Sequence, residues 1–244
     1  MRPQGDWPNR ASKVAPMRVL SVTHGPTVPG GVFDEVVVAA GHELERWVVP
    51  LGGMPQPVSS YDALMVFGGS MHPDQDEQFG WLEREADVLA RALAEDVPVL
   101  GVCLGAQLLA RAAGAWVGRA REPEVGWFDV HLTPAGRSDP VLGVLAPRTQ
   151  AFQWHHYTFG IPENGIELAR NELCTQAFRV GSRAWGLQFH AEVTLEMMRV
   201  WTAEDPDDLP VGVDEFLAVA ETRIANWNDQ GRALCAAFLE SAGS

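Results

Sequence analysis

The chain has 244 residues, of which 46% are hydrophobic and 20% are charged, a balance typical of a globular protein. Its formal net charge of −14 excludes nucleic acid and anionic membranes as expected partners, because both would be repelled and no basic run offsets the charge. The three cysteines are widely spaced without a C-x-x-C pair, which predicts neither a zinc site nor a disulfide framework.

The first part of the chain alternates strand-like and helix-like runs. Residues 1–16 are polar and have no apolar signal core, so we expect a flexible tail and a cytoplasmic protein. No apolar run is long enough to span a bilayer. Strands are then expected at residues 17–23, 45–49, 62–67 and 97–102, and helices at residues 32–40 and 77–94. This alternation predicts parallel βαβ units with helices on both faces of the sheet.

The pattern changes after a helix that begins at Leu104. Short strand-like runs separated by turn residues predict a mixed or antiparallel extension at residues 115–117, 126–132, 150–154, 167–170 and 174–180. A further core strand is expected at 184–189, followed by helices at 195–202 and about 214–240. We predict one domain over residues 17–203, with residues 204–244 forming an acidic loop and a C-terminal helix that pack on it.

The run from Val97 to Ala110 places a thiol at a strand-to-helix junction. Cys103 follows an apolar β-branched run and precedes the helix-forming run, and it is flanked two residues away by Gly101 and Gly105. This is the G-x-C-x-G form of a nucleophile elbow, a tight turn that requires small neighbours. The helix N-terminus would favour the thiolate form of the cysteine. The alternative is a small buried cysteine at the end of a core strand.

His190 and Glu192 directly follow the last predicted core strand. The carboxyl ends of parallel strands meet at one edge of a sheet, so His190 is expected at the same edge as Cys103. Glu192 can turn back and accept the second N–H of the imidazole. A nucleophile, a base and a group that orients the base form a catalytic triad.

An acyl-transfer site also needs donors for an oxyanion. The N–H of Leu104, directly after the nucleophile, is one candidate. Gly69, in the turn Phe67-Gly-Gly-Ser-Met71 after another parallel strand, is the second, because a missing side chain lets backbone approach a substrate. A simple β-to-α turn would also explain these glycines.

The segments FGGSM (67–71), GVCLGAQLLA (101–110) and GLQFHAEV (186–193) together resemble the signatures of class I, triad-type glutamine amidotransferases. The runs EVGW (124–127) and QWH (153–155) resemble the stand-alone, GMP-synthase-like members of that family. The resemblance covers residues 17–200. It implies an α/β, flavodoxin-like three-layer sandwich with a mostly parallel central sheet and a small antiparallel extension.

The resemblance also implies a reaction. Cys103 would attack the side-chain amide of glutamine, and the oxyanion would be held by the N–H groups of Gly69 and Leu104. His190 would protonate the departing ammonia and then activate water to release glutamate from a γ-glutamyl thioester, with Glu192 orienting the ring. Gln107 matches a family glutamine that helps to bind substrate; otherwise it would be an ordinary exposed helix residue. No metal or organic cofactor is implied, since thiolate and imidazole supply the chemistry.

The chain departs from the family at Trp154-His155-His156-Tyr157, where relatives carry Trp/Ser-His-Gly-Asp. His155, His156 and Tyr157 are candidate substrate-binding residues at the rim of the pocket, although both histidines could instead be structural. The remaining histidines, including His24, show no ligand spacing and are expected at the surface or in loops.

Three hypotheses follow. The first is a glutaminase that supplies ammonia to a separate synthase, because the chain is too short to carry an acceptor-activating domain. The second is a hydrolase of small γ-glutamyl compounds, favoured by the altered rim. The third is a catalytically silent binding or regulatory module, since a fold alone does not fix function.

Overall fold

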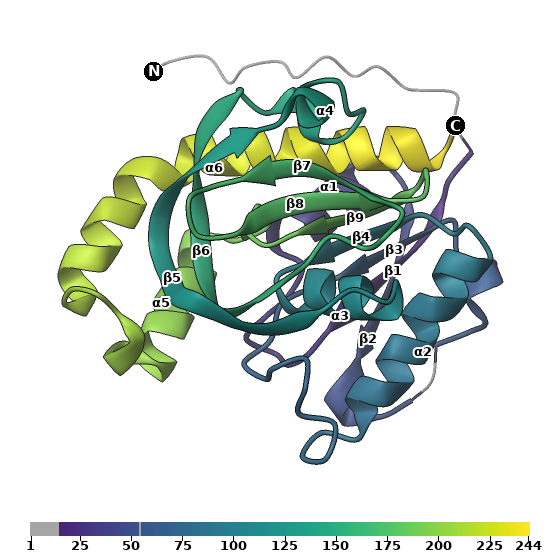
Figure 1. Cartoon of the computed structure of the whole chain (residues 1–244), viewed down its shortest axis with the longest axis horizontal. Coiled ribbons are helices and arrows are strands. Elements are labelled where there is room, and N and C mark those ends of the chain that lie inside the picture. Colours follow the sequence, from purple (N-terminus) through teal and green to yellow (C-terminus); the bar gives the residue numbers. More distant parts are fainter. Residues whose placement is uncertain (1–14, 54) are drawn as a thin grey trace.

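A single mixed sheet runs through the whole molecule (Figure 1). The computed structural model describes residues 15–53 and 55–244, so the predicted tail at residues 1–16 lies almost entirely outside the described residues. The sheet has nine strands in the order β2-β1-β3-β4-β9-β8-β7-β5-β6. No helix among the described residues is long and apolar enough to cross a membrane.

One half of the sheet is parallel, as the alternating sequence pattern predicts. Its strands pair in parallel from β2 through β9 and are β1 (Arg18–Thr23), β2 (Glu43–Val48), β3 (Ala63–Val66), β4 (Val99–Val102) and β9 (Ala184–Leu187). The connecting helices are α1 (Gly31–Ala39), α2 (Trp81–Ala94) and α3 (Leu104–Ala112). Helix α2 begins four residues later than predicted, because turns such as the Gln78 N–H to Gln75 carbonyl bond occupy the preceding residues.

The other half of the sheet corrects the prediction of a mostly parallel sheet with a small extension. It is antiparallel throughout and contains the two longest strands: β5 (Val117–Leu132), β6 (Arg148–Phe159), β7 (Gly165–Arg170) and β8 (Thr175–Val180). The sequence suggested two short strands in place of β5, because the charged run around Pro123 interrupts the apolar pattern. Pro123 is tolerated because β5 pairs with β7 only at its far end, and the register shift between Arg119 and Glu124 absorbs the irregularity.

Helices cover both faces of the sheet. Along β1, Val19 packs into one core and Leu20 into the other, the period-two alternation of a strand buried on both faces. The first core includes α1 and the long C-terminal helix α6 (Val213–Ala242), drawn in yellow in Figure 1, and the second includes α2 and α3. The remaining helices are α4 (Pro134–Arg137), which the sequence did not indicate, and α5 (Leu195–Glu204), with 3-10 turns at Val49–Leu51, Val58–Ser60, Leu142–Val144 and Pro206–Asp208.

Candidate active site

Three adjacent strands end at one edge of the sheet and bring the predicted site residues together. Strands β3, β4 and β9 are neighbours; Cys103 directly follows β4, and Gly69 and His190 lie three residues beyond the ends of β3 and β9. All three residues line one cavity at this edge. The sequence argument that parallel strand ends share an edge therefore places these residues correctly relative to one another.

Cys103 occupies the strained turn that the G-x-C-x-G pattern predicts. Its φ of 51° and ψ of −109° lie in a region that non-glycine residues seldom adopt. A Cβ at Gly105 would lie 2.1 Å from the Val66 carbonyl oxygen, and one at Gly101 would lie 2.6 Å from the Gly105 carbonyl oxygen. Both positions need glycine because β3, β4 and α3 meet there with no room for a methyl group. The turn directs Cys103 toward the cavity at the start of α3.

His190 lies between a thiol and a carboxylate, and all three residues are almost completely buried. Its Nδ1 is 2.8 Å from Oε1 of Glu192. Burial alone would lower the pKa of His190, but the charge of Glu192, the sulfur of Cys103 and hydrogen bonds to both raise that pKa well above its ordinary value. The contacts therefore favour an imidazolium between two groups that can carry negative charge. Cys103 also contacts the Trp154 carbonyl oxygen at 3.7 Å.

Two backbone N–H groups at the cavity have no partner within the described part of the chain. The amides of Gly69 and Leu104 donate to no backbone or side-chain acceptor there. Leu104 is the first residue of α3, and the N–H groups of the first helical turn have no acceptor within the helix. The two donors and the thiol line the same cavity. This is the arrangement that stabilises a developing oxyanion beside a nucleophile.

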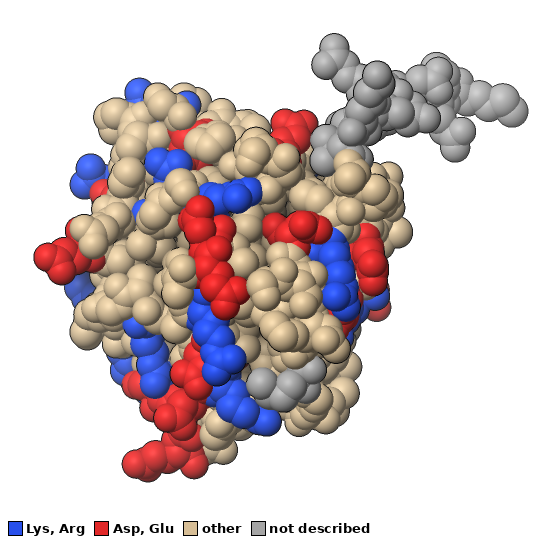
Figure 2. Space-filling view, turned by 90° about the vertical axis from the view of Figure 1, so that its right-hand side faces the viewer, with Lys and Arg blue, Asp and Glu red and all other residues tan. Residues whose placement is uncertain are grey.

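The cavity in front of Cys103 has a volume of about 550 Å³. Its lining includes Gln107, Arg119 and Tyr157, and also the acidic segment Glu204–Asp208. A smaller cavity of about 120 Å³ lies between Cys103, His190 and Trp201. Acidic and basic side chains lie side by side on the face of the molecule drawn in Figure 2.

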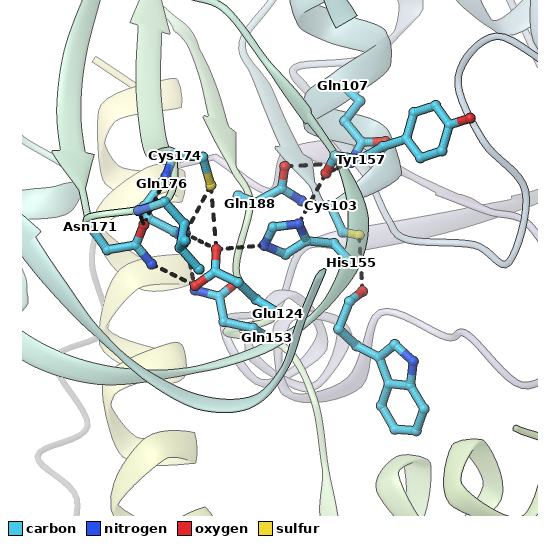
Figure 3. A network of polar contacts seen from close by, with 12 residues as sticks. Cys103, Gln107, Glu124, Gln153, His155, Tyr157, Asn171, Cys174, Gln176 and Gln188 are labelled. Atoms are coloured by element: carbon cyan, nitrogen blue, oxygen red, sulfur yellow. Dashed lines mark hydrogen bonds and ion pairs between the residues drawn. The ribbon is translucent and has the colours of Figure 1, made fainter. Parts of the chain in front are cut away.

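The side chain of Gln107 is buried, which contradicts its alternative interpretation as an exposed helix residue. Its Nε2 donates to the Tyr157 carbonyl oxygen at 2.9 Å and approaches Oε1 of Gln188 at 3.4 Å. His155 bonds the same Tyr157 carbonyl through Nδ1, at 3.0 Å. Helix α3 and strand β6 are thereby linked at the wall of the cavity (Figure 3).

His155 belongs to a buried network centred on Glu124 (Figure 3). Its Nε2 is 3.1 Å from Glu124, which also accepts from the amides of Asn171 and Gln176 and from the thiol of Cys174. Burial raises the pKa of Glu124, but the hydrogen bond and charge of His155, with the other donors, lower it overall. Both ring nitrogens of His155 are thus occupied within the protein, which favours the structural interpretation of this residue.

The same network contains donor atoms of the kind that bind metals. Ligand atoms of Glu124, His155 and Cys174 lie within 4.8 Å of one another. However, Asn171 and Gln176 direct N–H groups at the carboxylate, and such donors would repel a cation. Burial and the charge of Glu124 also raise the pKa of the Cys174 thiol to about 12, so the thiolate that a metal requires is disfavoured. The network fits a set of internal hydrogen bonds better than a metal centre.

His156 and Tyr157, two positions at which the sequence departs from the motif that it resembles, line the cavity in front of Cys103. Nε2 of His156 is 2.9 Å from Oδ1 of Asp208, whose other oxygen accepts the indole N–H of Trp154 at 2.7 Å. Tyr157 stacks on the imidazole of His72 with ring centroids 4.1 Å apart. The contacts of Trp154 and His156 therefore fasten the acidic segment to strand β6, and the rings of His72 and Tyr157 line one side of the cavity.

Three parts of the site were not anticipated from the sequence. The acidic segment was predicted only as a loop, because its position depends on contacts such as Trp154–Asp208 that cross 54 residues. Arg119 belongs to no recognisable sequence motif. It lines the cavity because strand β5 continues through the charged run. His24 lies in a loop, as expected, but it is buried against Glu85 and Gly68.

Comparisons with known proteins agree with the geometry. The family model for glutamine amidotransferase class-I matches residues 39–201. The chain is 28% identical to a glutamine amidotransferase-like protein, YfeJ, of Salmonella typhimurium, covering 89% of this chain and 94% of the relative. It is 33% identical to a glutamine-hydrolyzing GMP synthase subunit of Haloquadratum walsbyi over 57% of this chain and 70% of the relative. A Thermotoga maritima glutamine amidotransferase superposes with a TM-score of 0.84 at 26% identity, over 93% and 99% of the two chains. The chain therefore belongs to the class-I glutamine amidotransferase family.

Proposed function

We infer that the protein hydrolyses the side-chain amide of glutamine through Cys103, His190 and Glu192. The observation that carries this proposal is that Cys103 and His190 line one cavity, while Oε1 of Glu192 lies 2.8 Å from Nδ1 of the same imidazole. The two unpartnered N–H groups of Gly69 and Leu104, within the described residues, support it further. The reaction needs no group beyond these side chains and backbone donors.

In the proposed mechanism, the Cys103 thiolate attacks the amide carbon while Gly69 and Leu104 donate hydrogen bonds to the oxyanion. His190 then gives its proton to the amide nitrogen, so that ammonia leaves and a γ-glutamyl thioester remains. Water attacks the thioester after losing a proton to His190, and glutamate leaves as the sulfur regains its negative charge. Glu192 keeps the imidazole in one orientation through its bond to Nδ1.

The test uses the purified full chain with glutamine. We expect glutamate and ammonia in equal amounts, and we expect Cys103→Ser to abolish the reaction. Cys235→Ser is the matched control, because that thiol lies in α6 away from the cavity and its serine can still donate to the Phe33 carbonyl. A diazoketone analogue of glutamine should modify Cys103 selectively. Turnover that survives in Cys103→Ser would overturn the proposal, and an unlabelled Cys103 would favour a silent binding module.

We also propose that the ammonia passes to a separate acceptor enzyme. Free ammonia leaks into solvent unless a partner receives it, and the relatives include proteins named as glutamine-hydrolyzing subunits of GMP synthases. Addition of the cognate synthase should then couple glutamine consumption to product formation, and the stimulated rate should disappear in Cys103→Ser. If no added synthase alters the rate of glutamine hydrolysis, the separate-acceptor proposal fails while the glutaminase assignment stands.

A second candidate function is hydrolysis of small γ-glutamyl compounds. The cavity of about 550 Å³ falls in the range of roughly 300–1,000 Å³ that holds drug-sized ligands, and glutamine is far smaller. The acidic segment also lines this cavity, and its carboxylates would repel an anionic leaving group. A panel of γ-glutamyl amides with cationic, neutral and anionic amines decides between the candidates. A higher kcat/KM for free glutamine than for every amide would exclude this second function.

A further inference from the structure

A second buried histidine–carboxylate pair lies behind the glycine turn that follows β3. Nδ1 of His24 is 2.8 Å from the Gly68 carbonyl oxygen, and Nε2 is 2.8 Å from Oε2 of Glu85. Both side chains are essentially inaccessible to solvent, at 0% and 1%. The indole of Trp81 stacks on the imidazole with ring centroids 5.4 Å apart. None of these three side chains takes part in the chemistry proposed above.

The partners of His24 dictate its protonation. A backbone carbonyl can only accept a hydrogen bond, and so can an ionised carboxylate. An imidazole with both nitrogens facing such acceptors must carry two protons, which makes it an imidazolium. Burial lowers the pKa of His24, but the charge and hydrogen bond of Glu85 and the bond to Gly68 raise it overall, in agreement with this geometry.

The side chain of Glu85 makes no hydrogen bond other than that to His24 among the described residues. Its Oε2 contacts His24, and its Oε1 has no hydrogen-bond partner among the described residues although it is buried. Leaving a carboxylate oxygen unpaired inside a protein is costly. The pair is therefore not explained by packing alone, since an apolar pair of similar size would avoid that cost.

The peptide between Gly68 and Gly69 links this pair to the catalytic cavity. None of the peptide bonds in the described chain is cis, and in a trans peptide the carbonyl and the following N–H point in opposite directions. Fixing the Gly68 carbonyl toward His24 therefore fixes the Gly69 N–H on the opposite side. A Cβ at Gly69 would lie 2.9 Å from the Cβ of His24, so the two residues are in direct contact.

We propose that His24 and Glu85 are positioning residues that aim the Gly69 N–H into the oxyanion hole, an inference that rests on the proposed amide hydrolysis. The imidazolium bond withdraws electron density from the Gly68 carbonyl and makes the peptide N–H a stronger donor. His24 does not touch the substrate. It acts through one peptide plane, in the way that Glu192 acts through His190.

The test compares two variants that differ by one methylene and therefore in where the amide N–H lies. In a Glu85→Gln background, which removes the buried charge, His24→Asn places its amide near the position of Nδ1 and keeps a donor for Gly68. His24→Gln places its amide near the position of Nε2 and loses that donor. Loss of one oxyanion-hole donor costs about 10²–10³-fold in kcat. We expect the Gln variant to have a kcat roughly 10–10²-fold below the Asn variant, with KM changed by less than about threefold.

A second measurement separates positioning from general structural damage. Alkylation of Cys103 by iodoacetamide, followed by peptide mapping, reports the reactivity of the thiolate without passing through an oxyanion. We expect equal alkylation rates in the wild type and in both variants. His42→Gln is the control for replacing a histidine elsewhere in the chain. His42 accepts a hydrogen bond from the Met17 N–H at the opposite end of β1.

Each outcome has a distinct meaning. Equal kcat values in the Asn and Gln variants would overturn the inference and leave the proposed function intact. A parallel loss of kcat and alkylation would also overturn it, by showing that His24 supports the thiol site as a whole. A wild-type chain that hydrolyses neither glutamine nor any γ-glutamyl amide would overturn the proposed function and this inference together.

Discussion

Glu192 lies 2.8 Å from Nδ1 of His190, and its charge raises the pKa of that imidazole, so its substitution is the sharpest residue-scale prediction. Glu192→Gln keeps the size of the side chain but removes the charge that raises the pKa of His190. We expect kcat for amide hydrolysis to fall by about 10²–10⁴-fold, the usual contribution of an acid–base group. The imidazolium should also lose its proton at a lower pH, which should move the alkaline limb of the pH dependence of kcat downward.

Glu196→Gln is the matched control for this prediction. Glu196 lies four residues further on, at the start of α5, and its side chain is 80% exposed. The Glu196→Gln substitution removes one negative charge four residues from Glu192 without changing a group that contacts His190. Steady-state kinetics and alkylation between pH 5 and 9 would check both variants. Equal kcat values in the two variants would show that Glu192 does not orient the base.

The contrast between Cys103 and His24 shows what a sequence can reveal about a site. Cys103, His190 and Glu192 each follow a strand end within a short motif, so local pattern and the rule for parallel sheets suffice to group them. His24 meets Glu85 only because a loop and a helix 61 residues apart pack together. No local pattern encodes such a contact, and without an approximate fold the histidine resembles any loop residue.

At the scale of elements, helix α6 has a clear relation to the site although the family model ends at residue 201. The indole N–H of Trp227 donates to the His190 carbonyl oxygen at 2.8 Å, and Asn228 donates to the Val193 carbonyl oxygen at 2.6 Å. A Cβ at Gly231 would lie 2.0 Å from the Ala191 carbonyl oxygen. The helix therefore packs directly on the turn that carries His190 and Glu192.

Trp227→Phe tests this relation. The substitution retains most of the apolar packing but leaves the buried His190 carbonyl without its donor, at a cost of about 1–3 kcal/mol in unfolding free energy. Because the same bond holds the turn, kcat should fall as well. Urea unfolding and glutaminase kinetics measure the two effects. The control is Trp116→Phe, since that side chain is 61% exposed. A stability loss no larger than that of the control would contradict the prediction.

Element boundaries could be predicted well in the parallel half of the sheet and less well in the antiparallel half. Strands such as β4 are buried on both faces and produce continuous apolar runs that end at glycine or cysteine. The first part of strand β5, from Val117 to Pro123, is instead exposed or half-buried and carries charged residues. Its length is decided by pairing with β6, which is a tertiary property. The fold class was therefore correct, while the balance of parallel and antiparallel strands was wrong.

At the scale of the whole molecule, elements of two cores on opposite faces of one sheet contact the site from both sides. Helices α1 and α6 fix the β9 side through the turn at His190, and α2 fixes the β3 side through Glu85. Buried ionisable pairs therefore lie on both sides of the site, His190 with Glu192 on the β9 side and His24 with Glu85 on the β3 side. Their titration couples the stability of the whole chain to pH.

The sign of that coupling follows from the direction of each shift. His24 and His190 have raised pKa values in the folded chain, so their contribution to stability is complete below about pH 6.5, the ordinary value of histidine, and is lost as pH rises through the folded values. Glu124 has a lowered pKa, so its contribution is present above the ordinary glutamate value and is lost as pH falls through the folded value. Stability should be greatest between these two limits.

The alkaline side of this profile can be isolated by comparing the wild type with the double variant His24→Leu, Glu85→Leu. The variant lacks the titrating pair, whereas the partly exposed His42 and His72 remain in both chains and cancel. The wild-type advantage in unfolding free energy should shrink by up to about 1.4 kcal/mol per pH unit between the ordinary and the folded pKa of His24. Urea unfolding from pH 6 to pH 9.5 measures this slope. A difference that stays constant or grows with pH would mean that His24 is neutral in the folded chain, and the imidazolium proposed behind the oxyanion hole would be absent.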